Sequence, residues 1–122
     1  MTADDLEDYL RSIGLTVERA TDSNGLEYTL AREVEIASGG LRGKRCDVGI
    51  LRAATVPYVL PSAIHTRPAL VVMAPGEPLG TQASDLGPDW QYWSRRFDDQ
   101  PTPQRVWVHV LTILGDERWE PV

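Results

Sequence analysis

The stretch Trp90-Gln91-Tyr92-Trp93-Ser94-Arg95-Arg96 holds two of the four tryptophans of the chain, three residues apart. A segment rich in Gly and Pro precedes it, and an apolar run at residues 106–114 follows it. Trp and Arg are enriched in the hot spots of protein interfaces, but large aromatic side chains also pack in cores. Two interpretations are therefore open: a surface that binds a partner, and a structural cover at the base of the last element.

The composition is that of an ordinary globular protein. A chain of 122 residues suits one domain, residues 1–122, around one hydrophobic core. The formal net charge is -6, and the basic residues are scattered apart from Arg42-Gly43-Lys44-Arg45 and Arg95-Arg96. Because a phosphate-binding surface needs clustered Lys and Arg, we expect neither nucleic acid nor an acidic membrane as a partner.

The sequence shows no signal for a membrane, for export or for a cofactor. No apolar run approaches the roughly 20 residues of a membrane-spanning helix, and the N-terminus is acidic where a signal peptide is basic. We therefore expect a cytoplasmic protein. A single cysteine excludes an internal disulfide, and His65 and His109 lack the spacing of a helical zinc pair. We expect no metal or other cofactor, and structural roles for both histidines.

The N-terminal segment predicts a helix. Thr2 is a suitable N-cap, and Gly14 suits the left-handed position that follows a helix end. The apolar residues between them recur at helical spacing and form one stripe: Leu6, Tyr9, Leu10 and Ile13. We expect the acidic residues of this segment to form a solvated face.

The next segment predicts a three-stranded antiparallel meander. Asn24-Gly25 is a strong hairpin signal, and residues 38–40 form a second turn signal. Apolar residues alternate on both sides of that second turn, which places one face of each strand in a core: Leu26, Tyr28 and Leu30 before it, Cys46, Val48 and Ile50 after it.

The second half of the chain is punctuated by proline. Residues 55–68 read as a loop that carries Tyr58 and His65, and the apolar run 69–73 reads as a fourth strand. Residues 75–88 read as a long loop, and loops of this length are usually functional or mobile.

The last element is ambiguous between a strand and a helix. Residues 106–111 are rich in β-branched side chains, which favours a strand. Thr102-Pro103, however, is typical of a helix start, and Gly115 of a helix end. We predict a helix, and hence an α+β fold: a four-stranded antiparallel meander with an N-terminal helix and a helix after the Trp segment.

This order of elements resembles the ubiquitin-conjugating-enzyme (UBC) superfamily, which includes inactive relatives and RWD-type domains. Two segments resemble a bacterial branch encoded in ubiquitin-like modification operons: Pro57-Tyr58-Val59-Leu60-Pro61, and Trp90-Gln91-Tyr92-Trp93-Ser94-Arg95 before the last helix. Two features depart from the superfamily. Tyr58 is not directly followed by Pro, and the C-terminal helices of the full-length enzymes have no counterpart.

The resemblance implies a chemistry that needs a thiolate. In the superfamily this thiolate accepts a ubiquitin-like C-terminus as a thioester, and a nearby flap, usually His-Pro-Asn, stabilises the oxyanion. The resemblance places both groups within residues 74–89, which contain neither Cys nor His. The sole thiol, Cys46, falls in a predicted strand and reads as a small core residue. Thr81 and Ser84 are the hydroxyls of the interval, and neither has a base within it.

The sequence thus leads to the hypothesis of a non-catalytic UBC-like adaptor in a bacterial ubiquitin-like conjugation pathway. Its expected partner is the ubiquitin-like protein or the activating enzyme of the same operon. The expected contact residues are Tyr58, Trp90, Trp93, Arg95 and Arg96. Two alternatives stay open: an active conjugating enzyme that uses Cys46 or a partner's thiol, and an acidic immunity- or antitoxin-type protein that masks a basic partner.

Overall fold

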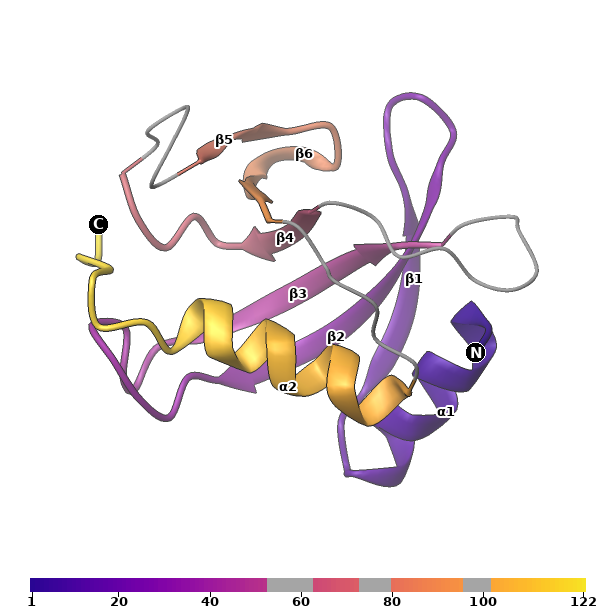
Figure 1. Ribbon diagram of the computed structural model, residues 1–122. Helices are drawn as coiled ribbons and strands as arrows, with labels where there is room; N and C mark the ends of the chain where they lie inside the picture. The colour runs from indigo at the N-terminus through magenta and orange to yellow at the C-terminus, as the bar shows by residue number, and fades with distance from the viewer. Residues whose placement is uncertain (53–62, 73–79, 96–101) are drawn as a thin grey trace.

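A computed structural model describes residues 1–52, 63–72, 80–95 and 102–122, and it has an α+β architecture (Figure 1). The described strands form one six-stranded antiparallel sheet in the order β1-β2-β3-β4-β6-β5. The elements follow one another along the chain as α1 (Ala3–Ser12), β1 (Val17–Thr21), β2 (Glu27–Glu35), β3 (Arg45–Leu51), β4 (Ala63–Arg67), β5 (Thr81–Ser84), β6 (Gly87–Ser94) and α2 (Pro103–Leu114).

The predicted N-terminal helix is confirmed as α1. The Thr2 hydroxyl accepts from the Asp5 amide at 3.1 Å, and the Thr2 amide donates to the Asp5 carboxylate at 2.8 Å. This reciprocal capping box satisfies two of the backbone donors at the helix start. Leu6 and Leu10 are buried, and Gly14 has a φ of 93°, in the left-handed region that ends the helix.

The predicted meander is confirmed as β1, β2 and β3. The turn between β1 and β2 depends on Asp22, whose Oδ1 accepts from the amides of Asn24 at 2.8 Å and Leu26 at 3.0 Å. Gly25 takes a φ of 82°, which glycine adopts without steric cost. The Asn24-Gly25 signal therefore located the hairpin correctly.

The predicted fourth strand at residues 69–73 is wrong. β4 lies earlier, inside the predicted loop 55–68, and within the described part of residues 69–73 Val71 makes an isolated bridge. The side chain of Gln91 stands in for a neighbouring strand: its Oε1 accepts from the Leu70 amide at 2.9 Å, and its Nε2 donates to the Val71 carbonyl at 2.7 Å. This segment is apolar because Leu70 and Val71 are buried, and not because it pairs as a strand.

The predicted long loop at residues 75–88 is also wrong in its second half. It contains β5 and the start of β6, and the Trp segment continues β6. The sheet therefore has six strands where four were predicted: β1, β2 and β3 were predicted, and β4, β5 and β6 were not. β6 lies between β4 and β5 in the sheet. Residues 73–79 lie outside the described part of the chain.

The predicted last helix is confirmed as α2. Its N-cap, Thr102, accepts from the Arg105 amide at 3.2 Å, and Pro103 occupies the first turn. At the other end the Gly115 amide donates to the Leu111 carbonyl at 2.8 Å. The segment is helical although it is rich in β-branched residues, because it has capping residues at both ends. Burial of Val106 and Val110 in the larger core also stabilises the helix.

Both helices cover the same face of the sheet (Figure 1), and the larger core lies between them and the strands. This core contains Leu6 and Leu10 of α1, Val110 of α2, and Ile50 and Trp93 of the sheet. A smaller cluster lies on the opposite face: Tyr28, Leu30 and Trp90, with Ala20, Leu51 and Leu86 packed against them.

The sheet curls around this smaller cluster. β1 and β5 form its opposite edges, yet the tips of the β1–β2 and β5–β6 hairpins meet. The Ser23 amide donates to the Asp85 carbonyl at 3.2 Å, and Asn24 Nδ2 donates to Asp85 Oδ2 at 3.1 Å. We call the face that carries Tyr28, Leu30 and Trp90 the concave face.

Residues 115–122 form a C-terminal segment that packs back on the molecule. Trp119 is buried, its indole donates to the Ile113 carbonyl at 2.6 Å, and the Val122 amide donates to the Leu70 carbonyl at 3.0 Å. Gly39 and Gly40, in the turn between β2 and β3, leave room for this segment. A Cβ added at Gly40 would lie 1.8 Å from the Trp119 carbonyl oxygen.

Candidate functional site

A cavity of about 300 Å³ opens on the concave face of the sheet. Side chains from each of the strands β2 to β6 and from the β5–β6 turn line it. They include Leu51 at the end of β3 and Ala63 at the start of β4. Its polar and aromatic lining among the described residues consists of Tyr28, His65, Gln82, Asp85 and Tyr92.

His65 and Ser84 form a close pair beside this cavity. The distance from His65 Nδ1 to Ser84 Oγ is 2.7 Å, and the same Oγ accepts from the Leu86 amide at 3.1 Å. β6 lies between β4 and β5 in the sheet, so the pair joins two strands across a third. Burial lowers the pKa of His65 to about 4, against the opposing effect of the Asp22 and Asp85 carboxylates, and the imidazole is neutral at pH 7.

Aromatic rings flank His65 on two sides. The ring of Tyr28 lies 5.0 Å from the imidazole centroid and that of Tyr92 lies 5.3 Å away, both in edge-to-face geometry. The Tyr28 hydroxyl donates to Asp22 Oδ2 at 2.9 Å. Burial and this contact with Asp22 raise the pKa of Tyr28, so its hydroxyl stays protonated.

The sequence missed the His65–Ser84 pair because the two residues lie 19 positions apart and both fell in predicted loops. A serine next to a histidine is the pattern of a nucleophile and its base. An efficient general base, however, has a pKa near the working pH, whereas the pKa of His65 is about 4. Among the described residues no carboxylate hydrogen-bonds to the imidazole, so the arrangement supports binding better than proton abstraction.

The two tryptophans of the Trp segment are buried on opposite faces of β6. Trp90 belongs to the concave face, where the Arg67 guanidinium lies 4.6 Å from its ring centroid. Trp93 belongs to the larger core, donates through Nε1 to Thr66 Oγ1 at 2.9 Å, and packs edge-to-face on Trp119 at 4.9 Å.

These positions limit how the predicted contact residues could meet a partner. Trp90 and Trp93 are 7% and 0% exposed, and Arg95 lies 5.8 Å from the Trp93 ring centroid. The indoles therefore support the guanidinium groups stacked on them, and they offer little surface of their own. Tyr58 and Arg96 lie outside the described residues.

Cys46, the sole thiol of the chain, is 3% exposed in β3 and belongs to the larger core together with Val48, Ile50 and Leu10. Burial, assisted by the neighbouring charge of Asp47, raises the pKa of Cys46 to about 12. The predicted core position of this residue is confirmed. A thiol that is buried and protonated is a poor nucleophile.

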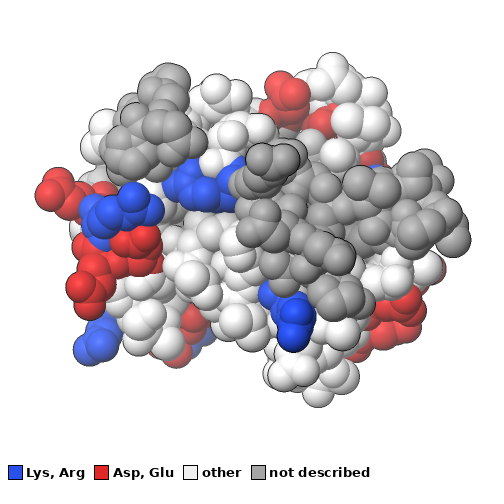
Figure 2. Space-filling view, in the orientation of Figure 1, with Lys and Arg blue, Asp and Glu red and all other residues white. Residues whose placement is uncertain are grey.

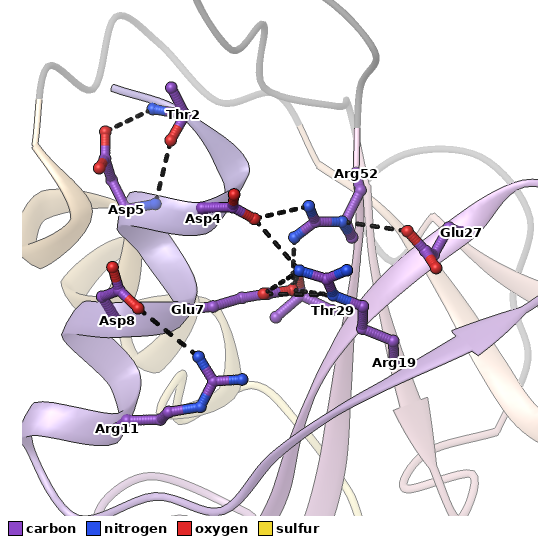
Figure 3. A network of polar contacts seen from close by, with 10 residues as sticks. All are labelled: Thr2, Asp4, Asp5, Glu7, Asp8, Arg11, Arg19, Glu27, Thr29 and Arg52. Atoms are coloured by element: carbon purple, nitrogen blue, oxygen red, sulfur yellow. Dashed lines mark hydrogen bonds and ion pairs between the residues drawn. The ribbon is translucent and has the colours of Figure 1, made fainter.

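A charged network attaches α1 to the sheet (Figure 3). Glu7 is 1% exposed, and its carboxylate accepts from Arg19 at 2.9 Å, from Thr29 at 2.6 Å and from Arg52. Burial opposes ionisation of Glu7, but the hydrogen bonds from Arg19 and Thr29 prevail and lower its pKa. The predicted solvated acidic face is thus wrong for Glu7, because only the tertiary structure brings the arginines to it.

Basic side chains form separate groups on the face shown in Figure 2, and acidic side chains gather at its margins. Within the described ranges, His, Cys, Asp and Glu side chains form no group of three that could hold a metal ion. Neither described helix is long and apolar enough to cross a membrane.

Comparison with protein-family models, with curated proteins and with solved structures found no match to this chain.

Proposed function

We propose that this chain is a UBC-like binding domain that takes part in a ubiquitin-like conjugation pathway without forming a thioester. The state of Cys46 carries the proposal: the one thiol of the sequence is 3% exposed, and burial raises its pKa to about 12. A thioester carrier needs a thiol that is accessible and partly ionised. Cys46 meets neither condition.

The order of elements supports the UBC-like part of the proposal. α1 precedes the antiparallel strands β1 to β4, and α2 follows the Trp segment. β5 and β6 are an addition to the four strands that the resemblance implies. The proposed partner is the ubiquitin-like protein or the activating enzyme of the same operon. Its proposed contact surface is Tyr58, Trp90, Trp93, Arg95 and Arg96. The Arg67 guanidinium lies over the Trp90 ring, and that of Arg95 lies over the Trp93 ring.

A thioester-trapping experiment tests the non-catalytic part. The chain is incubated with the activating enzyme and the ubiquitin-like protein of its operon and with ATP, and the products are separated by non-reducing electrophoresis. We expect no reductant-sensitive adduct, and we expect slow reaction of folded Cys46 with a water-soluble thiol reagent. An adduct that disappears in Cys46→Ser would show an active conjugating enzyme instead.

A binding measurement with the same two proteins tests the adaptor part. We expect titration calorimetry to detect binding of one of them, and Arg95→Ala to weaken it. Arg105→Ala serves as the control, because Arg105 is exposed at the start of α2. Absence of binding to both proteins would refute the adaptor role. Strongly salt-dependent binding to an unrelated basic protein would favour the immunity-type alternative.

A further inference from the structure

The cavity on the concave face has a feature that the proposed function does not use. His65 is 95% buried, since 5% of its surface is exposed, and it lines the cavity. Ser84 occupies Nδ1, and no contact of the described residues gives Nε2 a hydrogen-bond partner. Every fully buried polar side-chain atom of the described residues has a hydrogen-bond partner. Since Nε2 has no such partner, it is not fully buried, and we infer that it faces the cavity that His65 lines.

The charges around the cavity are negative. Asp85 lines it, and both Asp85 and Asp22 lie close enough to His65 to act on its titration. The described lining includes no Lys or Arg. Asp85 lines the cavity and Asp22 does not, so Asp85, whose Oδ2 also accepts from Asn24, is the carboxylate that a ligand would meet. An anionic ligand would be repelled here, and a cation would be attracted.

The aromatic side chains also favour a cation. Tyr28 and Tyr92 lie on either side of His65, within 5.3 Å of its ring centroid, and both line the cavity. The face of an aromatic ring attracts an ammonium group placed within about 6 Å of its centroid. His65 is neutral, and in the tautomer whose Nδ1–H donates to Ser84 Oγ its Nε2 lone pair is a further acceptor.

We propose that this cavity binds the alkylammonium group of a lysine side chain that a partner protein presents. Its volume of about 300 Å³ suits one side chain and lies at the lower end of the range for small-molecule sites. The ammonium group donates to the Asp85 carboxylate and to His65 Nε2, and the tyrosine rings enclose the alkyl stem. The proposal is independent of the ubiquitin-like pathway, because it rests on the concave face alone.

A titration with two matched probes tests the charge requirement. The probes are Nα-acetyl-lysine methylamide and the same compound acetylated at Nε, and the readout is the NMR spectrum of the His65 ring and of the β4 and β6 amides. We expect saturable shifts in the millimolar range with the lysine probe, and binding about tenfold weaker after acetylation removes the charge. Equal responses to both probes, or no shift at His65, would overturn the proposal.

A pair of variants locates the binding site. Asp85→Asn keeps an oxygen that can accept from Asn24 and removes the charge, and we expect it to weaken the lysine probe about three- to tenfold. Asp89→Asn is the matched control, because Asp89 is exposed at the start of β6 and does not line the cavity. Equal affinities in the two variants would overturn the site. An arginine probe that binds as tightly as the lysine probe would overturn the assignment to lysine.

Discussion

His65 lies in β4 between two tyrosine rings, and its imidazole is neutral because water is largely excluded from it. Its chemistry follows from the strands that surround it. In the sequence His65 is an isolated histidine in a proline-rich segment, and no sequence motif links it to Ser84. The same holds for Glu7, whose arginine partners come from β1 and from the end of β3.

The buried imidazole predicts a pH dependence of stability. The pKa of His65 is about 4 in the folded protein and 6.5 as its ordinary value, so the unfolded state binds more protons between these pH values. The free energy of unfolding should therefore fall as the pH drops from 6.5 toward 4, by at most about 3 kcal/mol. Urea unfolding over this range measures the loss.

The His65→Gln variant is the control for this pH dependence. It should be less stable than the parent at pH 7, because Ser84 loses a partner, but its stability should fall less than that of the parent between pH 6.5 and 4. Carboxylates whose pKa values are lowered in the folded protein, such as Glu7 and Asp47, have ordinary values of 4.5 and 3.8, so they add a loss near pH 4 that both proteins share. Parallel curves for the two proteins would show that His65 is not the titrating group.

At the scale of secondary structure, elements with local signals were predictable and elements without them were not. α1 and α2 carry capping residues at both ends, and the β1–β2 hairpin carries Asn24-Gly25. β4 and β5 mix polar and apolar residues, and both are held by pairing with β6. The strand prediction for residues 69–73 failed because a side chain, Gln91, pairs with the backbone of Leu70 and Val71 in place of a strand.

The attachment of α1 can be tested by comparing two neighbouring acidic residues. Glu7→Ala leaves the buried Thr29 hydroxyl and the largely buried Arg52 without their shared partner, and we expect a loss of about 3–5 kcal/mol in the free energy of unfolding. Asp8→Ala removes a carboxylate that is 78% exposed and pairs with Arg11 at 3.6 Å, so its effect should stay within about 0.5 kcal/mol. Similar losses in both variants would mean that the network does not hold α1.

At the scale of the whole molecule, the C-terminal segment belongs to the core. Trp119 is 3% exposed and packs on Trp93, which is itself fully buried. Composition and periodicity could not reveal this, because residues 115–122 have no regular pattern. The candidate site was equally hidden from the sequence, since it forms where residues of five strands meet.

The role of this segment predicts a large effect of one substitution. Trp119→Ala should lower the free energy of unfolding by about 3–5 kcal/mol, because it leaves a cavity beside Trp93 and removes the bond to the Ile113 carbonyl. Glu120→Ala, at the exposed neighbouring position, should change it by less than about 0.5 kcal/mol. Denaturant titrations give both values. A loss for Trp119→Ala as small as that for Glu120→Ala would show that the segment adds little to stability.

The contact between the two hairpin tips also bears on self-association. The outer strands of a sheet carry unpaired backbone groups, which can recruit another chain and start aggregation. Here those strands are short, five residues in β1 and four in β5, and β1 carries charged residues at Glu18 and Arg19. By holding the sheet in a curl, the bonds from Ser23 and Asn24 to Asp85 keep both edges bent away from the flat geometry in which sheets stack edge to edge. We therefore expect this contact between the hairpins to disfavour edge-to-edge self-association.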